Sequence, residues 1–576
     1  MIRGKKLVTT GFFPESVQQD DLIFAADWCF NGNQEMEEQF KGKVLQYPVK
    51  PQDAVEIREI ILQVYLVLLS RLTCVYNERF GIKKPEKYYE LLLGRWLYHF
   101  LHNVYERMAL LNAAVKEHHP VRTDVCAPSI AFSFDSDDYN QKTYLSHTFN
   151  LRLFSAVARH IDGINFNVIE TPETDIGWIR SQASGREKLA SVYQNFLCAV
   201  NRIFTKKLIL VVSPYYPSNT FINSLWFFWK SKFRVVHYRF NRVLSTPEAT
   251  DAALRNKMAD KIKMDNEDSL LTIASSILFS FIPHSFLENF QKLREEAIQW
   301  HRKNPNLQVL FTANAIHTEE RFKYLTAEAP KAELWISQHG FGYGVNKVLS
   351  SEEYERKAAT RYFTWGWGKD VLPNAKLVPP GNISYKEKSR ILFTFPTISE
   401  YSGLLETPMV YSYDLPHYIQ LSDSVMEGLE KEQREAVYIR QLKRTGLRYL
   451  PMPADLKIDQ VPDFHSSLVN ARIHLSNHFG TPFLESLAWN IPTVIIHPPL
   501  EGYLREDAIP DFEKLQRAKI IFTDPSEAAN HLNEVYNDID GWWQSENVQQ
   551  AVKSFIYKYA RPHQQWRSVW LRTFLQ

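Results

Sequence analysis

The residues with the clearest chemical potential stand between positions 474 and 499, in the stretch HLSNHFGTPFLESLAWNIPTVIIHPP. Polar residues and one glycine fill its first part, and an apolar, β-branched run follows. This order predicts a strand over 471–475, a helix that begins with Thr481 as N-cap and Pro482 as its first residue, and a buried parallel strand over 493–496. Backbone N–H groups at the start of such a helix have no partner within the helix and bind anions well.

The same stretch places further polar groups around this helix start. Gly480 permits a close backbone approach to an anion. Glu485, one turn into the helix, can accept hydrogen bonds from sugar hydroxyls. A strand–helix–strand unit with a polar turn and no ligand is the alternative interpretation.

Ligands of open parallel sheets bind beyond the carboxyl ends of the strands, so the residues that follow predicted strands form one group of candidates. They are Gln338, His339, Gly340, Gly342 and Gly344 after 333–337, Arg440, Lys443 and Arg444 at the end of 437–442, and Asn477, His478, Gly480 and Thr481 after 471–475. Basic residues, histidines or glycine loops thus follow three of the predicted strands. Arg440 could instead be a salt-bridged surface arginine, and His339 could be a structural histidine.

The spacing of apolar residues predicts an α/β protein in which strands alternate with helices, which is typical of parallel sheets covered on both faces. The expected strands cover residues 6–10, 22–25, 208–213, 233–238, 307–312, 333–337, 361–365, 391–396, 437–442, about 447–450, 471–475 and 493–496. Residues 52–118 form an amphipathic helical insertion, and the chain is helical again from about residue 541.

A stretch rich in Pro, Gly, Asn and charge, about 370–390, is the expected linker. It divides the chain into an N-terminal domain over 1–375 and a Rossmann-like domain over 388–540. The helices of 541–576 are expected to pack back on the N-terminal domain.

Composition excludes some classes of protein. The 576 residues hold 67 Lys and Arg against 65 Asp and Glu, so the net charge of +2 gives no general attraction to nucleic acid. The four cysteines are far apart and form no metal-ligand spacing with histidine, and we expect no metal and no other cofactor. The acidic run DSDD at 135–138 is expected to be a solvated loop.

No secretory signal sequence is evident, and no segment is expected to supply the roughly 20 apolar residues of a membrane span. The most apolar run, VYLVLL at 64–69, is short and part of an amphipathic pattern. These features predict a cytoplasmic protein, with the aromatic stretch 224–234 as one candidate for peripheral contact at the inner face of the membrane.

Seven stretches together resemble one family. KLVTT, ADWC, YYELLLGRWLYHFLHNVYER, QHGFGYG, FTWGWG, NHFGTPFLESLAWNIPTVI and DGWW are similar to the bacterial LIC12162-type transferases of surface-polysaccharide biosynthesis, from about residue 6 to 560. The resemblance implies two Rossmann-like domains in a GT-B-like arrangement. It also implies a glycosyltransferase that moves a sugar from a nucleotide-sugar donor to a glycan or lipid-linked glycan, as in capsule or lipopolysaccharide assembly.

This resemblance gives the candidate residues their roles. The domain over 388–540 binds the nucleotide sugar, and the domain over 1–375 lies on the acceptor side. The expected nucleotide-sugar-binding residues are Arg440, Lys443, Asn477, His478, Gly480, Thr481 and Glu485. Arg440, Gly480 and Thr481 are expected near phosphate and Glu485 near the ribose hydroxyls, while Gly340, Gly342 and Gly344 form the acceptor-side loop. His339, with Gln338 beside it, acts on the acceptor hydroxyl as general base or stabilises developing charge.

The donor stays open between a CMP-linked ulosonic acid, such as CMP-Kdo, and a UDP-sugar. Two other classes of protein also fit the residues. One is a sugar-nucleotide epimerase of the same architecture, and the other is a binding or scaffold protein of polysaccharide assembly that has lost its activity.

Overall fold

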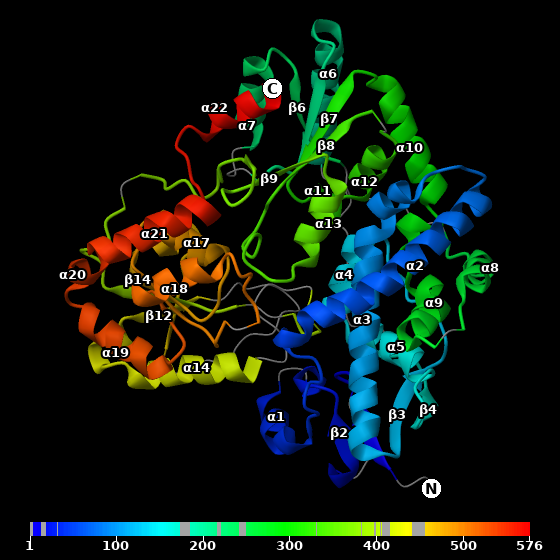
Figure 1. Ribbon diagram of the computed structural model, residues 1–576, viewed down its shortest axis with the longest axis horizontal. Helices are drawn as coiled ribbons and strands as arrows, with labels where there is room; N and C mark the ends of the chain where they lie inside the picture. The colour runs from blue at the N-terminus through cyan, green and yellow to red at the C-terminus, as the bar shows by residue number, and fades with distance from the viewer. Residues whose placement is uncertain are drawn as a thin grey trace. The chain divides into compact units, whose positions relative to one another are not determined.

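The computed structural model describes residues 4–12, 19–30, 33–172, 185–215, 220–240, 249–265, 267–329, 331–381, 383–396, 399–401, 403, 405, 415–440, 456–500 and 502–576. The chain forms two compact units (Figure 1). The first comprises Met1–Ser213, Val236–Leu334 and Ser399–Glu406, and the second comprises Pro214–Val235, Trp335–Ile398 and Thr407–Gln576. Residues 335–375, which the sequence assigned to the N-terminal domain, thus belong to the same unit as residues 415–576.

The first unit contains a parallel sheet of strand order β2-β1-β3-β4. Its strands are β1 Lys5–Val8, β2 Leu22–Phe24, β3 Val121–Cys126 and β4 Ile164–Ile169. The expected strands over 6–10 and 22–25 are confirmed. They form a separate sheet with β3 and β4 and do not pair with the later strands of the chain. β3 and β4 were not expected, because β3 alternates with polar residues and β4 exposes most of its side chains.

The helical insertion expected over 52–118 is confirmed as α2 Ala54–Phe80 and α3 Glu86–His118. The two helices pack against each other, and α2 also packs on α8 Ala252–Ile262 and α9 Ser269–Phe281. By length and composition the segment Pro51–Phe80 could cross a membrane, so the expectation that no segment could do so is wrong. In this structure 44% of the most apolar 18-residue stretch of this segment is buried.

The acidic run at 135–138 is the start of a helix and not a solvated loop. The Asp135 carboxylate accepts a hydrogen bond from the backbone N–H of Asp138 at 3.0 Å and caps α4 Ser136–Leu145. Asp135 and Asp138 are both buried.

A second sheet has the order β10-β9-β8-β7-β5-β6. Its strands are β5 Leu208–Val212, β6 Val235–Tyr238, β7 Leu307–Thr312, β8 Glu333–Ser337, β9 Arg361–Thr364 and β10 Asp370–Val371. Five of the six were predicted. The sixth, β10, opens the stretch that was expected to be a linker.

The second unit contains a third, entirely parallel sheet of order β13-β12-β11-β14-β15-β16. Its strands are β11 Arg390–Thr394, β12 Val437–Arg440, β13 Lys457–Ile458, β14 Ala471–Ser476, β15 Thr493–Ile496 and β16 Ile521–Phe522. The chain runs outward from β11 to β13 and then returns to β14 on the other side, which is the strand order of a dinucleotide-binding Rossmann domain. The topological switch point therefore lies between β11 and β14. The strand expected near 447–450 lies outside the described residues.

Helices cover both faces of this third sheet (Figure 1). They include α14 Leu415–Gly428 and α19 Pro525–Val535 on one face, and α17 Thr481–Ala488, α18 Ile509–Arg517 and α21 Glu546–Tyr559 on the other. The remaining α-helices are α1 Gln34–Phe40, α5 His147–Ala158, α6 Gly185–Phe204, α7 Thr220–Lys230, α10 Phe290–Lys303, α11 Ala315–Thr318, α12 Glu320–Ala327, α13 Ser350–Ala358, α15 Lys431–Glu435, α16 Phe464–Val469, α20 Ile539–Trp543 and α22 Trp566–Leu575.

The C-terminal helix α22 packs on α7 within the second unit. The Phe227 ring contacts the rings of Trp566 and Phe574, and Trp570 Nε1 donates to the carbonyl of Pro373 at 2.9 Å. Both α7 and Pro373 fall inside the range 1–375 to which the C-terminal helices were expected to return. The packing buries Phe227, so the aromatic stretch 224–234 is not one continuous exposed surface.

Candidate active site

The loop after β14 leads directly into α17 at the switch point of the third sheet. Gly480, in extended conformation, is the N-cap of this helix, and Thr481 and Pro482 are its first residues. The prediction of Thr481 as N-cap is therefore wrong by one position, because Gly480 is the last extended residue and Thr481 already belongs to the helix. Pro482 has no N–H, and the N–H groups of Phe483 and Leu484 donate to the Gly480 carbonyl at 3.2 and 3.5 Å. The N–H of Thr481 is therefore the donor at the helix start that an anion can use.

The side chains of this loop are packed under the helix start. Asn477 is buried and its Nδ2 donates to Ser422 Oγ at 2.9 Å, while its Oδ1 has no hydrogen-bond partner among the described residues. An unpartnered buried acceptor is uncommon and suits a ligand that donates a hydrogen bond. His478 Nδ1 lies 3.1 Å from Ser476 Oγ, and burial lowers the pKa of His478 to about 3. This histidine is therefore neutral at physiological pH.

The glycine loop after β8, residues 338–344, is rigidly held. Gln338 Oε1 accepts hydrogen bonds from Trp365 N at 3.1 Å and Trp367 Nε1 at 2.8 Å, and its Nε2 donates to the Gly340 carbonyl. Gln338 thus shapes the loop, and its expected place on the catalytic side stays a prediction. Gly344 has a φ of 70°, and a Cβ there would lie 2.4 Å from the Trp367 ring.

The other two glycines of this loop differ in whether another residue could replace them. Gly342 has a φ of 96°, a conformation that glycine adopts easily. A Cβ at Gly340 would make only an ordinary contact, at 3.9 Å from the Tyr343 ring.

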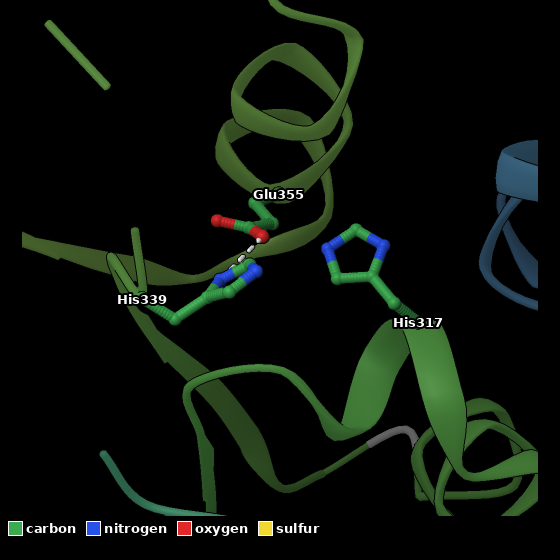
Figure 2. Close-up of side chains that lie close together, drawn as sticks. All are labelled: His317, His339 and Glu355. Atoms are coloured by element: carbon green, nitrogen blue, oxygen red, sulfur yellow. Dashed lines mark ion pairs between the residues drawn. The ribbon is translucent and has the colours of Figure 1, made fainter. Parts of the chain in front are cut away.

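His339 in this loop faces a buried carboxylate (Figure 2). Its Nδ1 lies 3.3 Å from Glu355 Oε1, and the Tyr343 hydroxyl donates to the same oxygen at 2.9 Å. Tyr362 donates to the second Glu355 oxygen at 3.2 Å. The Glu355 side chain is 0% exposed and that of His339 is 24% exposed, so the imidazole alone of this pair reaches solvent.

This pairing was not predicted, because Glu355 lies on α13 and follows no strand. A carboxylate that holds Nδ1–H of a histidine fixes the ring tautomer and leaves Nε2 as the proton acceptor, which is the arrangement of a general base. His317, also drawn in Figure 2, belongs to the first unit.

The two loops meet through aromatic side chains within the second unit. The Phe341 ring stacks on Phe479, with 6.0 Å between centroids and 17° between planes, and meets Phe483 edge-on at 6.1 Å. Phe341 is two positions after His339, and Phe483 is two positions before Glu485. The two loops therefore contact each other within one unit, and the expectation that His339 and Glu485 face one cleft stays a prediction.

Backbone hydrogen bonds fasten the glycine loop to the segment that follows β15. Lys347 N donates to the Tyr503 carbonyl at 2.7 Å, and Arg505 N donates to the Val345 carbonyl at 2.9 Å. Glu352 accepts from Gly344 N at 2.8 Å and pairs with Arg505 at 3.4 Å. The loop thus cannot move independently of the third sheet.

Glu485 is the centre of a polar group at the first turns of α17. His465 Nε2 lies 3.3 Å from Glu485 Oε1, and this hydrogen bond raises the pKa of His465. Lys376 Nζ lies 3.7 Å from the centroid of the Tyr215 ring. Burial lowers the pKa of Lys376, and the nearby Glu485 charge opposes that change. Burial likewise raises the pKa of Tyr215 to about 12, with a smaller contribution from Glu485.

The sequence did not single out His465, Lys376 or Tyr215. Lys376 stood in the expected linker, and Tyr215 comes from a segment 270 positions before Glu485. Together these residues surround the helix start with a carboxylate, an imidazole, an ammonium group and a phenol, which suits a ligand that carries both phosphate and hydroxyl groups.

The Arg440 guanidinium group is bound by other residues of the protein and is not left free for a ligand. One guanidinium nitrogen donates to Asp459 Oδ2 at 2.8 Å, to the Val461 carbonyl at 2.7 Å and to Ser467 Oγ at 2.9 Å. These contacts favour the alternative of a salt-bridged structural arginine, and a role in donor binding stays a prediction. Lys443 and Arg444 lie outside the described residues.

Replacing Arg440 by Ala should lower the free energy of unfolding by about 1.5–3 kcal/mol, because Asp459 would lose a charge-assisted hydrogen bond. Urea unfolding measures this change, and the exposed Arg517→Ala variant, expected within about 0.5 kcal/mol of wild type, is the control. Wild-type stability together with a ten-fold loss of nucleotide affinity would instead place Arg440 in the ligand site.

Comparison with known proteins gives two kinds of result. Solved structures that are similar include the glycosyltransferase SnogD from Streptomyces nogalater, with a TM-score of 0.30 and 11% identity over 64% of this chain and 100% of that chain. The rhamnosyltransferase SpnG, complexed with spinosyn aglycone, has a TM-score of 0.30 and 10% identity over the same shares. Similarity this low supports no argument about function. None of the curated proteins matches the sequence. The model of the LIC12162 family transferases, however, matches residues 5–574, and the chain therefore belongs to this family of transferases.

Proposed function

We propose that this transferase moves a sugar from a nucleotide-sugar donor to a hydroxyl group of a surface glycan or lipid-linked glycan. The observation that carries the proposal is the contact of Phe341 with Phe479 and Phe483. It joins the loop of the His339–Glu355 pair to the helix start beside Glu485. In this proposal the proton acceptor and the anion site belong to one site.

The donor is proposed to bind at the switch point between β11 and β14. Its phosphate accepts a hydrogen bond from the backbone N–H of Thr481 at the start of α17, and the Lys376 ammonium group neutralises part of its charge. Glu485 accepts hydrogen bonds from ribose hydroxyls. The unpartnered Asn477 Oδ1 accepts one more from the base or the sugar.

His339 is proposed to remove the proton from the acceptor hydroxyl. As the acceptor oxygen bonds to the anomeric carbon, the bond from that carbon to the phosphate oxygen breaks and the nucleotide leaves. The proton passes to His339 Nε2, and the Glu355 carboxylate stabilises the imidazolium ion that results.

A screen of CMP-, UDP-, GDP- and dTDP-sugars by thermal shift tests the proposal and identifies the donor. A ligand present at about 100 times its Kd adds roughly 2.7 kcal/mol of stability. CMP-linked ulosonic acids and UDP-sugars are the expected stabilising groups. Turnover then separates the classes of protein. Free nucleotide with a glycosylated acceptor supports the proposal, an isomerised sugar indicates an epimerase, and binding without turnover indicates a scaffold.

The His339→Ala variant should lower kcat by about 10²- to 10⁴-fold, the usual contribution of a general base, while donor affinity stays near wild type. Glu355→Gln should have an effect in the same direction, because it removes the charge that stabilises the imidazolium ion. Steady-state kinetics and nucleotide titration measure the two quantities. A wild-type kcat in His339→Ala would exclude this residue as the base.

The Glu485→Gln variant should mainly raise the donor KM, by about ten- to hundred-fold, because the ribose contact is the same in the ground and transition states. Lys376→Met should raise the donor KM and also lower kcat, because the phosphate gains charge as its bond to the sugar breaks. Lys386→Met, whose lysine is exposed and pairs with Asp540, is the matched control and should leave KM unchanged. A fall in kcat at constant KM in either test variant would contradict a role in donor binding.

Activity should survive EDTA, because the α17 N-terminus and Lys376 supply the positive potential that a phosphate needs. Turnover before and after chelation measures this. Loss of turnover that Mg²⁺ or Mn²⁺ restores would show that a divalent ion performs the neutralisation.

A further inference from the structure

Helix α6 of the first unit has an apolar stripe that faces solvent. Leu189, Val192, Phe196 and Ile203 are 72%, 69%, 62% and 76% exposed. Their spacings of three, four and seven positions place the four side chains on one face of the helix. Such a stripe of large side chains is uncommon on a soluble protein unless the surface binds something.

The opposite side of α6 fixes the helix in the fold. Leu197, Cys198 and Asn201 are buried, and α6 packs against β5. Asn201 also accepts a hydrogen bond from Asn306 Nδ2 at 2.8 Å. The exposed stripe is therefore the outer face of an anchored helix, and the helix need not leave the unit to present it.

A basic cluster lies at the C-terminal end of this stripe. It consists of Arg202, Lys206 and Lys207 at the end of α6 and Arg302 and Lys303 at the end of α10. The Arg202 guanidinium group donates to the carbonyl of Lys303, which joins the two parts. All five side chains are exposed, and none forms an ion pair within the part of the chain that the structure describes.

We propose that α6 binds the surface of an anionic lipid bilayer. The four apolar side chains enter the boundary between head groups and acyl chains, and the five cations contact anionic head groups. The five cations favour an anionic membrane over a second copy of the chain as the binding partner of this surface. A second copy that packed the same face around a two-fold axis would bring two unpaired basic clusters to one interface, whereas an anionic membrane neutralises them. The surface would bring the transferase to membrane-borne acceptors, but its binding to lipid does not depend on the proposed sugar transfer.

Sedimentation of the full-length protein with vesicles tests this inference. Vesicles of phosphatidylcholine mixed with phosphatidylglycerol should bind the protein, and vesicles of phosphatidylcholine alone should bind it at least about ten-fold less. The double variant Lys206→Gln, Lys207→Gln should lower binding to the mixed vesicles by about ten-fold or more. Phe196→Ser should have a similar effect through lost apolar insertion.

Val168→Ser, which changes an exposed apolar residue on β4 of the same unit, is the matched control and should bind as wild type does. Circular dichroism of each variant checks the fold, and the charge variant keeps the test informative if Phe196→Ser unfolds. Equal binding to both kinds of vesicle, unchanged binding of the α6 variants, or no binding of the wild-type protein would overturn the proposal. A wild-type dimer in solution that Phe196→Ser converts to a monomer would also overturn it, in favour of a second copy.

Discussion

The packing of Phe341 between the loop after β14 and the first turn of α17 is the contact on which the candidate site depends. Aromatic pairs of this kind contribute about 0.5–1.5 kcal/mol beyond the area that they bury. Without this contact, His339 and Glu485 would be polar residues of two unrelated strand ends. The backbone hydrogen bonds of Val345 and Lys347 with the segment after β15 also hold the glycine loop against the third sheet. The loop that carries His339 is therefore held by the segment after β15 of the third sheet and also by Trp365 and Trp367, which follow β9 of the second.

The electrostatics of the site divide it into two halves. Burial lowers the pKa of both His474 and His478 to about 3, so these imidazoles are neutral above pH 5 and supply no charge to a phosphate. His474 is held between Thr394 and Ser486 by two hydrogen bonds of 2.8 Å and serves the packing of β11, β14 and α17. Positive charge at the helix start comes from Lys376, from the helix itself and from the protonated form of His465, whose pKa the hydrogen bond to Glu485 raises. In the half around His339, the Glu355 carboxylate that pairs with the imidazole is fully buried. A buried negative charge beside an imidazole suits proton transfer and does not suit phosphate binding.

Much of the fold could be predicted from local patterns, because buried parallel strands such as β15 are continuous apolar runs. β3 and β4 escaped prediction, since their polar and exposed residues resemble a loop. The start of α17 was misplaced by one residue because Gly480 and Thr481 both make good N-caps. Lys376, His465 and Tyr215 could not be found from spacing, since tertiary contacts bring them to Glu485 from distant segments. Arg440 had the right type and position for a phosphate contact, but its partners at 459–467 are visible only in three dimensions.

The most direct test of the central claim is a crystal structure of the protein with a donor analogue whose sugar is joined to the phosphate by an unreactive carbon link. The account predicts phosphate oxygens within hydrogen-bond distance of the backbone N–H of Thr481 and of Lys376 Nζ, a ribose at Glu485, and an anomeric carbon that faces His339. A nucleotide bound away from the β11–β14 switch point, or a sugar that points away from the His339–Glu355 pair, would contradict it.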